Sequence, residues 1–253
     1  MFDFKGQAVI VTGAGSPKGI GRDTALAFAE QGANVVVADV DIEGAQQVAV
    51  EIEKLGVRSI AFKLDVTDPK STAAMADATI KEFGKIDVLV NNAGITQPVK
   101  VKDMTLDDFR RINEVNLMGV FNCCKAVMEH MKEKKYGRIV NLSSVSAKQG
   151  GGVFGGAHYC ASKAGVLGFS KSLARELVLE GITVNSVCPG AADTEIRKGR
   201  TSDEIERQIL AGIPMKRVAT VREISAAIVF LASKEASYIT GEDIDINGGV
   251  HMD

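Results

Sequence analysis

Short runs of β-branched, apolar residues alternate along this chain with longer stretches in which apolar residues recur at helical spacing. Runs that are apolar almost throughout suit strands buried on both faces, and strand–helix–strand order with short joints favours a parallel sheet. The pattern predicts an α/β fold, either an open sheet or a closed eight-stranded barrel. The expected strands are 7–13, 34–40, 58–66, 86–92, 137–144, 182–190 and 242–248, and the expected helices lie near 19–31, 42–55, 69–83, 105–134, 157–180 and 221–233.

No feature of the sequence divides the chain. Its 253 residues contain no linker rich in Pro, Gly or Ser and no fixed-period repeat, which predicts a single domain over 1–253. A net charge of −2 favours neither a nucleic-acid nor a membrane partner, and no apolar run approaches the ~20 residues that span a bilayer. The absence of a signal-peptide pattern, and four cysteines (123, 124, 160 and 188) without disulfide or zinc spacing, predict a cytoplasmic protein with no metal site.

A glycine-rich turn follows the first expected strand. Residues 12–22 read TGAGSPKGIGR, with glycines at 13, 15, 19 and 21. Such glycines let a backbone turn tightly and approach an anion, whose charge the following helix N-terminus favours. The usual G-x-G-x-x-G pattern fails, because its third glycine, counted from Gly13, falls on Lys18. By itself the turn fits a phosphate site and a packing role about equally.

Asp39 ends the second expected strand, about 20 residues beyond the turn. A carboxylate at this point bonds the ribose hydroxyls of an adenosine and repels a 2′-phosphate, so it favours NAD over NADP. Lys18 argues the other way, because a lysine in the turn can pair with a 2′-phosphate. We rank Asp39 higher, since a carboxylate facing a phosphate costs more than an exposed lysine gains. Asp39 and Asp41 also fit a simple helix-capping role.

A tyrosine and a lysine stand four residues apart in the stretch AHYCASKAG, residues 157–165. In a helix, Tyr159 and Lys163 share one face. A free tyrosine has a pKa of about 10, and a neighbouring ammonium lowers that pKa toward the range of a general base near neutral pH. In an arbitrary helix, however, the same spacing is usually a lysine that extends past a half-buried tyrosine. The pair therefore needs the support of a wider pattern.

Taken together, the motifs resemble those of the classical short-chain dehydrogenases/reductases over essentially the whole chain. The resemblance is carried by TGAGSPKGIG, LDV (64–66), NNAG (91–94), EVNLMGVF with its Asn116, NLSS with its Ser144, YCASK and PGAADT. It implies a single-domain, Rossmann-type, doubly wound sheet of about seven parallel strands with helices on both faces.

The resemblance also implies a role for each matching residue. Tyr159 is the general acid/base, and Ser144, with Ser143 as its rival, holds the substrate oxygen. Lys163 bonds the nicotinamide ribose, and Asn116 anchors a chain of water molecules that carries the proton. The implied cofactor-binding residues are Gly13, Gly15, Lys18, Gly19, Ile20, Gly21, Asp39, Asp65, Val66, Asn92, Ala93, Gly94, Tyr159, Lys163, Pro189, Gly190 and Thr194.

Two stretches depart from the family pattern. Five residues separate Gly13 from Gly19 where the family usually has three, and the interval from Ser144 to Tyr159 is about two residues longer than usual. The second extension, GGGVFGG (150–156), falls beside the expected substrate pocket. We predict that this pocket consists of 95–99, 145–158 and a polar, partly helical substrate loop within 191–220.

The main prediction is an NAD-dependent oxidoreductase that interconverts a secondary alcohol and a ketone, with a sugar or polyol as the first choice of substrate. IVNLSS, SKAGVLGFSKSLARE and ASYITGEDIDINGG are similar to 3-oxoacyl-carrier-protein reductases, which makes a 3-oxoacyl thioester the alternative, although those enzymes usually prefer NADPH. A non-enzymatic dinucleotide-binding regulator is a third hypothesis. The resemblance also implies a homotetramer that packs through the helices near 105–134 and 157–180, although the apolar stripe VFNCCKAVMEHM also fits an internal core.

Overall fold

The computed structural model describes residues 2–151, 153, 155–195 and 202–252. Within them, seven parallel strands form one open sheet in the order β3–β2–β1–β4–β5–β6–β7. Each strand lies inside a run expected from the sequence, which confirms the Rossmann-type fold and rules out the barrel. The strands are β1 (Ala8–Thr12), β2 (Asn34–Asp39), β3 (Ser59–Lys63), β4 (Val88–Asn91), β5 (Gly137–Leu142), β6 (Ile182–Pro189) and β7 (Asp243–Ile246).

The order of the strands reverses beside β1. The chain adds β2 and β3 on one side of β1 and then returns to place β4 on the other side. In open α/β sheets, ligands bind outside the carboxyl ends of the strands at such a reversal. The glycine turn follows β1 and the NNAG segment follows β4, so both predicted binding segments lie at this point.

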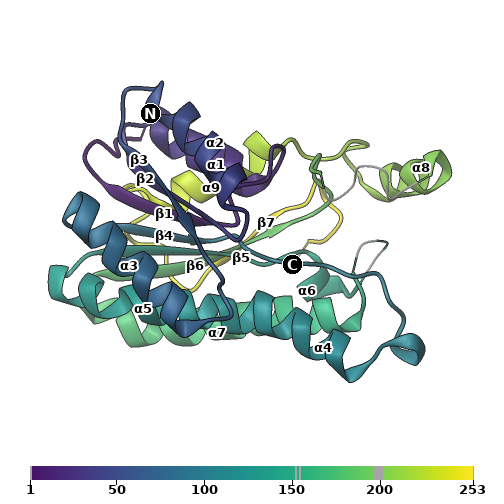
Figure 1. The fold of residues 1–253 in the computed structure, drawn as a ribbon. Helices are drawn as coiled ribbons and strands as arrows, with labels where there is room; N and C mark the ends of the chain where they lie inside the picture. The colour runs from purple at the N-terminus through teal and green to yellow at the C-terminus, as the bar shows by residue number, and fades with distance from the viewer. Residues whose placement is uncertain (1, 152, 154, 196–201, 253) are drawn as a thin grey trace.

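Helices cover both faces of the sheet (Figure 1). On one face lie α1 (Ile20–Glu30), α2 (Ile42–Glu53) and α9 (Val221–Ala232), and on the other lie α3 (Pro69–Phe83), α5 (Gly119–Lys134) and α7 (Ala157–Leu177). Alternate residues of a strand point to opposite faces. Accordingly, Val9 and Val11 belong to the apolar core under the first layer, whereas Ile10 belongs to the core under the second.

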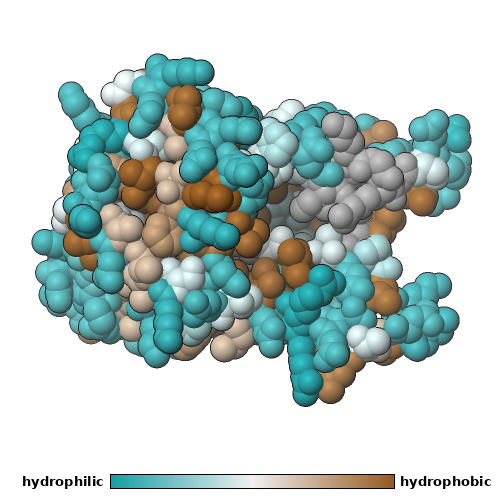
Figure 2. All heavy atoms as spheres, in the orientation of Figure 1, coloured by the Kyte–Doolittle hydropathy of each residue, from teal (hydrophilic) through white to brown (hydrophobic). Residues whose placement is uncertain are grey.

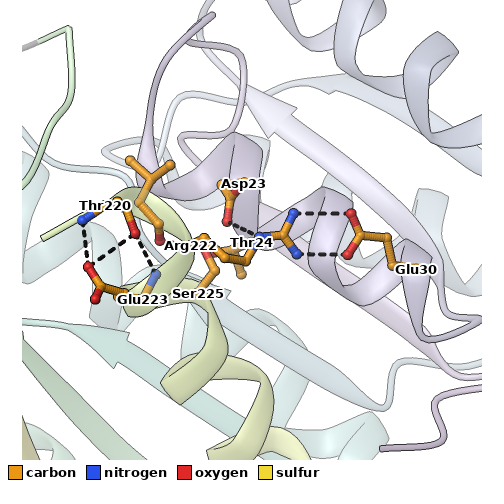
Figure 3. Close-up of polar contacts among 8 residues, drawn as sticks. Asp23, Thr24, Glu30, Thr220, Arg222, Glu223 and Ser225 are labelled. Carbon is orange, nitrogen blue, oxygen red and sulfur yellow. Dashed lines mark hydrogen bonds and ion pairs between the residues drawn. The ribbon is translucent and has the colours of Figure 1, made fainter. Parts of the chain in front are cut away.

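Polar contacts fasten α1 to α9 (Figure 3). Arg222 of α9 pairs with Asp23 at 3.2 Å and with Glu30 at 2.7 Å, both on α1. Beside this network, the hydroxyls of Thr24 and Ser225 lie 3.2 Å apart in a buried hydrogen bond. Because α1 begins where the glycine turn ends, these contacts fix the start of α1 relative to the segment that leads into α9.

The helix ends follow local capping rules. The Asp41 carboxylate caps α2, and Asp68 caps α3, whose first residue is Pro69. At α9, Thr220 and Glu223 form a reciprocal capping box. The sequence left open whether Asp39 or Asp41 caps this helix, and the structure shows that Asp41 does.

Several elements differ from the expected ones. The single helix expected over 105–134 is divided into α4 (Leu106–Asn113), the π-helical turn η2 (Glu114–Met118) and α5. The helix expected over 157–180 closes with a 3₁₀ turn, η3 (Val178–Glu180). Two short elements, η1 (Val101–Asp103) and α6 (Ser146–Gln149), were not expected.

The predicted substrate loop contains one helix, α8 (Asp203–Gly212). Residues 196–201 of this loop, and 152 and 154 of the glycine-rich stretch, lie outside the described residues. In the part of the chain that is described, no helix is long and apolar enough to cross a membrane.

Candidate active site

The glycine turn brings the end of β1, the start of α1 and the loop after β4 into close contact. Gly13 has a φ of +66°, and a Cβ there would lie 2.7 Å from the Cα of Ala93. A Cβ on Gly21 would lie 2.4 Å from the carbonyl oxygen of Gly13. Gly19 is the N-cap of α1 and Ile20 is its first residue. The longer turn thus keeps the tight helix–strand packing that the third glycine of the usual pattern provides.

Asp39 lies at the edge of this turn. Its carboxylate accepts hydrogen bonds from the backbone N–H of Gly15 at 2.7 Å and of Asp41 at 3.0 Å. A Cβ on Gly15 would lie 3.0 Å from the Asp39 Cγ, so a larger residue would force the turn and the carboxylate apart. The carboxylate keeps further acceptor capacity. A glycine cradle with a fixed carboxylate at its edge fits the adenosine half of a nicotinamide dinucleotide.

The NNAG segment is tied to the end of β1. The Thr12 hydroxyl accepts the backbone N–H groups of Asn92 and Ala93, both at 3.1 Å. In return, the Asn92 amide donates to the carbonyl oxygens of Thr12 and Gly13 at 2.9 and 2.8 Å. Thr12 was not among the predicted residues, although its place directly before the glycine turn was a usable signal.

The predicted adenine contacts, Asp65 and Val66, follow β3. The Asp65 carboxylate accepts the backbone N–H and the hydroxyl of Thr67 at 2.9 and 2.7 Å, and these bonds lower the pKa of Asp65. Val66 is buried against α5, where a Cβ on Gly119 would lie 2.7 Å from its Cγ2. Asp65 is therefore an exposed loop residue and Val66 a packing residue.

The segment after β6 returns to the glycine turn. Gly190 packs closely on the residue after β7, since a Cβ there would lie 2.9 Å from the Cα of Asn247. The Pro189 carbonyl, at the end of β6, accepts the backbone N–H of Val145 at 3.0 Å. These contacts set the direction in which the chain leaves the sheet.

Further along this segment, the chain reaches the turn itself. The backbone N–H of Glu195 donates to the carbonyl oxygen of Lys18 at 2.9 Å, and the Lys18 ammonium pairs with Asp193 at 2.7 Å. Thr194 lies between these two contacts and is partly buried. The structure thus brings Thr194 beside the glycine turn and pairs Lys18 with Asp193, a partner that the sequence did not predict.

Tyr159 and Lys163 lie on one face of α7. The Lys163 Nζ is 6.0 Å from the centre of the Tyr159 ring and donates to the carbonyl oxygen of Leu142 at 2.6 Å. Ser144, just beyond β5, forms a side-chain hydrogen bond with Tyr159 and accepts the backbone N–H of Ser146 at 3.1 Å. Three of the four predicted catalytic side chains therefore adjoin one another.

Ser143, the rival of Ser144, is engaged elsewhere. Its hydroxyl donates to the backbone carbonyl of Lys163 at 2.9 Å, and the residue is only 3% exposed. It joins β5 to α7. The hydroxyl that adjoins Tyr159 is that of Ser144.

Burial reverses the expected acidity of Tyr159. Desolvation raises the pKa of Tyr159 above its ordinary value, and the hydrogen bond with Ser144 offsets this only in part. Burial also lowers the pKa of Lys163 to about 8. The expectation of a lowered tyrosine pKa is therefore wrong, because the ammonium is directed at the Leu142 carbonyl and desolvation of the phenolate outweighs its attraction. At neutral pH the phenol is protonated.

Asn116 lies in the π turn η2 and is fully buried. Its Oδ1 accepts the backbone N–H of Ile95 at 2.8 Å, and its amide donates to the Ile95 carbonyl at 2.9 Å and to the Ser162 hydroxyl at 3.1 Å. A Cβ on Gly94 would lie 3.2 Å from the same Oδ1. The side chain thus ties the loop after β4 to α7. Insertions of this kind in a helix frequently occur at functional sites.

A further set of polar contacts supports Tyr159 from the other side. The buried His158 accepts the backbone N–H of Tyr159 on its Nδ1 at 2.9 Å, and its Nε2 lies 3.3 Å from the Gln97 Oε1. The Gln97 amide in turn donates to Asp108 at 2.8 Å. Both residues fall in segments predicted to line the pocket, 145–158 and 95–99, but the contact between them spans 61 residues and no sequence pattern predicts it.

The glycine-rich extension before α7 packs on Tyr159. A Cβ on Gly155 would lie 2.5 Å from the Cδ1 of the tyrosine ring, and one on Gly151 would lie 3.2 Å from the Cys160 Sγ. Gly155 therefore lets the described part of this stretch approach the ring directly. Figure 2 shows the surface indented on this side, between the part that carries α8 and the part that carries α4.

A Rossmann-type sheet with a glycine turn at its reversal point and a Tyr–Lys pair beside it is the arrangement of a dinucleotide-dependent oxidoreductase. A family model described as enoyl-(acyl carrier protein) reductase matches residues 13–251. The chain is 41% identical to an uncharacterized short-chain type dehydrogenase/reductase, y4mP, of Sinorhizobium fredii, over 97% of this chain and 98% of that protein. The chain belongs to the short-chain dehydrogenase/reductase family.

Two further relatives carry a more specific name. The 3-oxoacyl-(acyl-carrier-protein) reductase FabG of Escherichia coli is 43% identical over 99% of both chains. The protein of the same name from Staphylococcus aureus is 42% identical over 97% of this chain and 98% of its own length. These similarities extend over the whole fold and are not confined to the dinucleotide-binding half.

Proposed function

We propose that this protein is an NADH-dependent reductase of 3-oxoacyl thioesters in which Tyr159 is the general acid. The observation that carries the proposal is the grouping of three side chains, in which the Tyr159 phenol adjoins Ser144 and lies one helical turn from Lys163. Such a phenol can donate a proton, which is what the reduction of a ketone requires. The names of the relatives favour the acyl-thioester alternative over the sugar or polyol that the sequence places first.

Tyr159 and the residues around it have different roles in the proposed reduction of the ketone. Ser144 donates a hydrogen bond to the substrate carbonyl oxygen and favours the negative charge that develops there. Tyr159 transfers its phenolic proton to the same oxygen. Lys163 stands one turn away and stabilises the phenolate that remains. A nicotinamide dinucleotide bound along the glycine turn supplies the hydride to the carbonyl carbon.

Asn116 supports this site from behind. Its side chain is used on Ile95 and Ser162, so we infer that it acts by fixing the loop after β4 and the π turn relative to α7. Water ordered at this turn would return a proton to Tyr159 after each cycle. That path remains part of the proposal.

Asp39 supports NADH as the reductant. Its carboxylate is held beside Gly15 by two backbone N–H groups and so cannot easily withdraw from a ligand at the ribose position. A 2′-phosphate there would meet a fixed negative charge at close range. The dinucleotide would also contact the segments 65–66 and 92–94, which follow β3 and β4. At the end of β6 and beyond it, the dinucleotide would contact Pro189, Gly190 and Thr194.

We also infer a homotetramer. Exposed apolar side chains continue along α4, η2 and α5, and the aromatic rings of Phe121 and Phe169 join α5 to α7 at 6.2 Å between centroids. Apolar exposure of this kind on helices is typical of a surface that another chain covers. The exposed residues are Leu106, Phe109, Met118 and Phe121.

The experiment that tests the function is the oxidation of NADH, followed by absorbance, with a 3-oxoacyl thioester and with a panel of ketose sugars. We expect turnover with the thioester and little with the sugars. Tyr159→Phe should lower kcat by about 10²- to 10⁴-fold, the range for loss of a general acid, while NADH still binds.

Tyr238→Phe is the matched control, because Tyr238 is fully exposed and removal of its hydroxyl should leave the rate unchanged. Faster turnover of the sugars than of the thioester would instead support a sugar or polyol as the substrate. A near-normal rate for Tyr159→Phe would remove the proposed acid. Binding of NADH without turnover of any substrate would favour a regulator.

A further inference from the structure

The lengthened glycine turn makes a contact across the cleft with the segment after β6. The Lys18 Nζ lies 2.7 Å from the Asp193 Oδ2, and the two residues are 175 positions apart in sequence. Two backbone bonds hold the partners in place. The N–H of Glu195 donates to the Lys18 carbonyl at 2.9 Å, and the N–H of Asp193 donates to the Ala219 carbonyl at 2.9 Å. Lys18 is thus held in the turn, directly before α1, with its ammonium directed at Asp193.

The ion pair between Lys18 and Asp193 is easily broken, whereas the neighbouring Asp39 carboxylate is held in place. The side chains of Lys18 and Asp193 are 49% and 59% exposed, and pairs this exposed contribute little and weaken with salt. The Asp39 carboxylate instead receives two backbone N–H groups, including that of Gly15, three positions before Lys18. One turn therefore carries a fixed negative charge and a positive charge that can change partner.

Resting on the proposed function, we propose that Asp193 is a specificity-determining residue for the dinucleotide. It holds the Lys18 ammonium away from the ribose position at Asp39, so that a 2′-phosphate meets a carboxylate without a compensating cation. To pair with Lys18, the 2′-phosphate of NADP(H) would have to break the ion pair between Lys18 and Asp193. NAD(H) lacks this phosphate and leaves the ion pair intact. Asp193 acts through Lys18 and need not touch the ligand.

The test measures binding and needs no substrate. The dissociation constants of NADH and NADPH are determined from the fluorescence of the bound reduced nicotinamide, for the unmodified protein, Asp193→Asn, Lys18→Gln and the double variant. Asp193→Asn should tighten NADPH binding by roughly two- to fivefold, the span of one partly exposed charge contact. NADH binding should change less than about twofold, and added salt should reduce the gain.

The double variant separates the proposed route from a general effect of charge. When Lys18 is already glutamine, Asp193→Asn should no longer improve NADPH binding. Asp203→Asn, which removes one negative charge from the first turn of α8, is the matched control and should leave the NADPH constant unchanged.

Several results would overturn the proposal. They are an unchanged NADPH constant in Asp193→Asn, a gain that persists in the double variant, and an equal gain in Asp203→Asn. Loss of affinity for both dinucleotides would also overturn it, because that would show the ion pair to be a structural fastening of the loop. If the protein binds both dinucleotides yet reduces no 3-oxoacyl thioester, the proposed function is refuted. The binding measurements would still decide whether Asp193 controls the preference between the two dinucleotides.

Discussion

At the residue scale, burial governs the chemistry of Tyr159 and Lys163. Both are ordinary titrating side chains in water, but in the cleft the pKa of the phenol rises and that of the ammonium falls to about 8. Each shift disfavours the charged form of the group. At neutral pH the resting site therefore holds its proton on the phenol of Tyr159.

His158 carries a prediction at this scale. Its Nδ1 accepts the Tyr159 N–H in the first turn of α7, where helix N–H groups have no partner within the helix. We expect His158→Phe to lose this acceptor and shift the tyrosine, lowering kcat by about fivefold, which corresponds to the ~1 kcal/mol of one lost capping bond. KM for the thioester should change less. Steady-state kinetics measure the effects on kcat and on KM separately.

His158→Asn is the control, because an asparagine oxygen can occupy the place of Nδ1 and should restore most of the rate. If His158 only filled space, the His158→Asn and His158→Phe variants would lose activity equally. That result would exclude the positioning role of His158. Binding of NADH, measured by fluorescence, should be unaltered in both variants.

The sequence reveals some of these residues and not others for a physical reason. Tyr159 and Lys163 can be assigned to one face from their spacing alone, because the helix period sets it. The hydrogen bond between Asn116 and Ser162 spans 46 residues and depends on tertiary packing. The pKa of Tyr159 depends on how much protein surrounds the phenol, which no local pattern records.

At the element scale, the division of the expected helix over 105–134 has a clear cause. Helical periodicity runs through the whole stretch, so the sequence predicts one helix. In the structure, Asn116 is buried and bonds the backbone of Ile95, and the chain accommodates it in a π turn. One extra residue in a helical turn hardly alters the periodicity, so the sequence does not reveal it.

Helix α9 carries a prediction on pH. Arg217 and the capping bonds with Thr220 lower the pKa of Glu223 from 4.5 to about 2. A carboxylate whose folded-state pKa is depressed stabilises the fold above its unfolded pKa, and this stabilisation is lost as the pH falls from about 4.5 toward 2. Glu223→Gln should therefore lower Tm by roughly 2–4 °C near neutral pH, the range for one helix cap in a chain of this size.

The difference in Tm between the two proteins should narrow as the pH falls from 6 to 3, measured by circular dichroism. Glu235→Gln, in the exposed turn after α9, is the matched control for loss of one negative charge. A difference that stays constant down to pH 3 would show that the carboxylate charge of Glu223 does not support the cap.

At the scale of the whole molecule, the strand segments were predictable and the contacts between distant loops were not. Every expected run became a strand because a buried parallel strand is apolar along its length. The ion pair between Lys18 and Asp193 joins loops after β1 and β6, which two strands separate in the sheet. Only the folded arrangement brings such loops together, so sequence spacing could not pair them.

The assembly gives the last prediction. Phe109 is 42% exposed on α4, and burial of this exposed part of the ring against a partner contributes about 1 kcal/mol. We expect the protein to have a mass near four times 26.8 kDa by light scattering, and Phe109→Glu to shift it to a smaller species, because a carboxylate would be buried in the interface. Val50→Glu is the control, since Val50 is similarly exposed at 53% but lies on α2, across the sheet. A wild-type protein that runs as a monomer would exclude the tetramer, and equal dissociation in both variants would place the interface elsewhere.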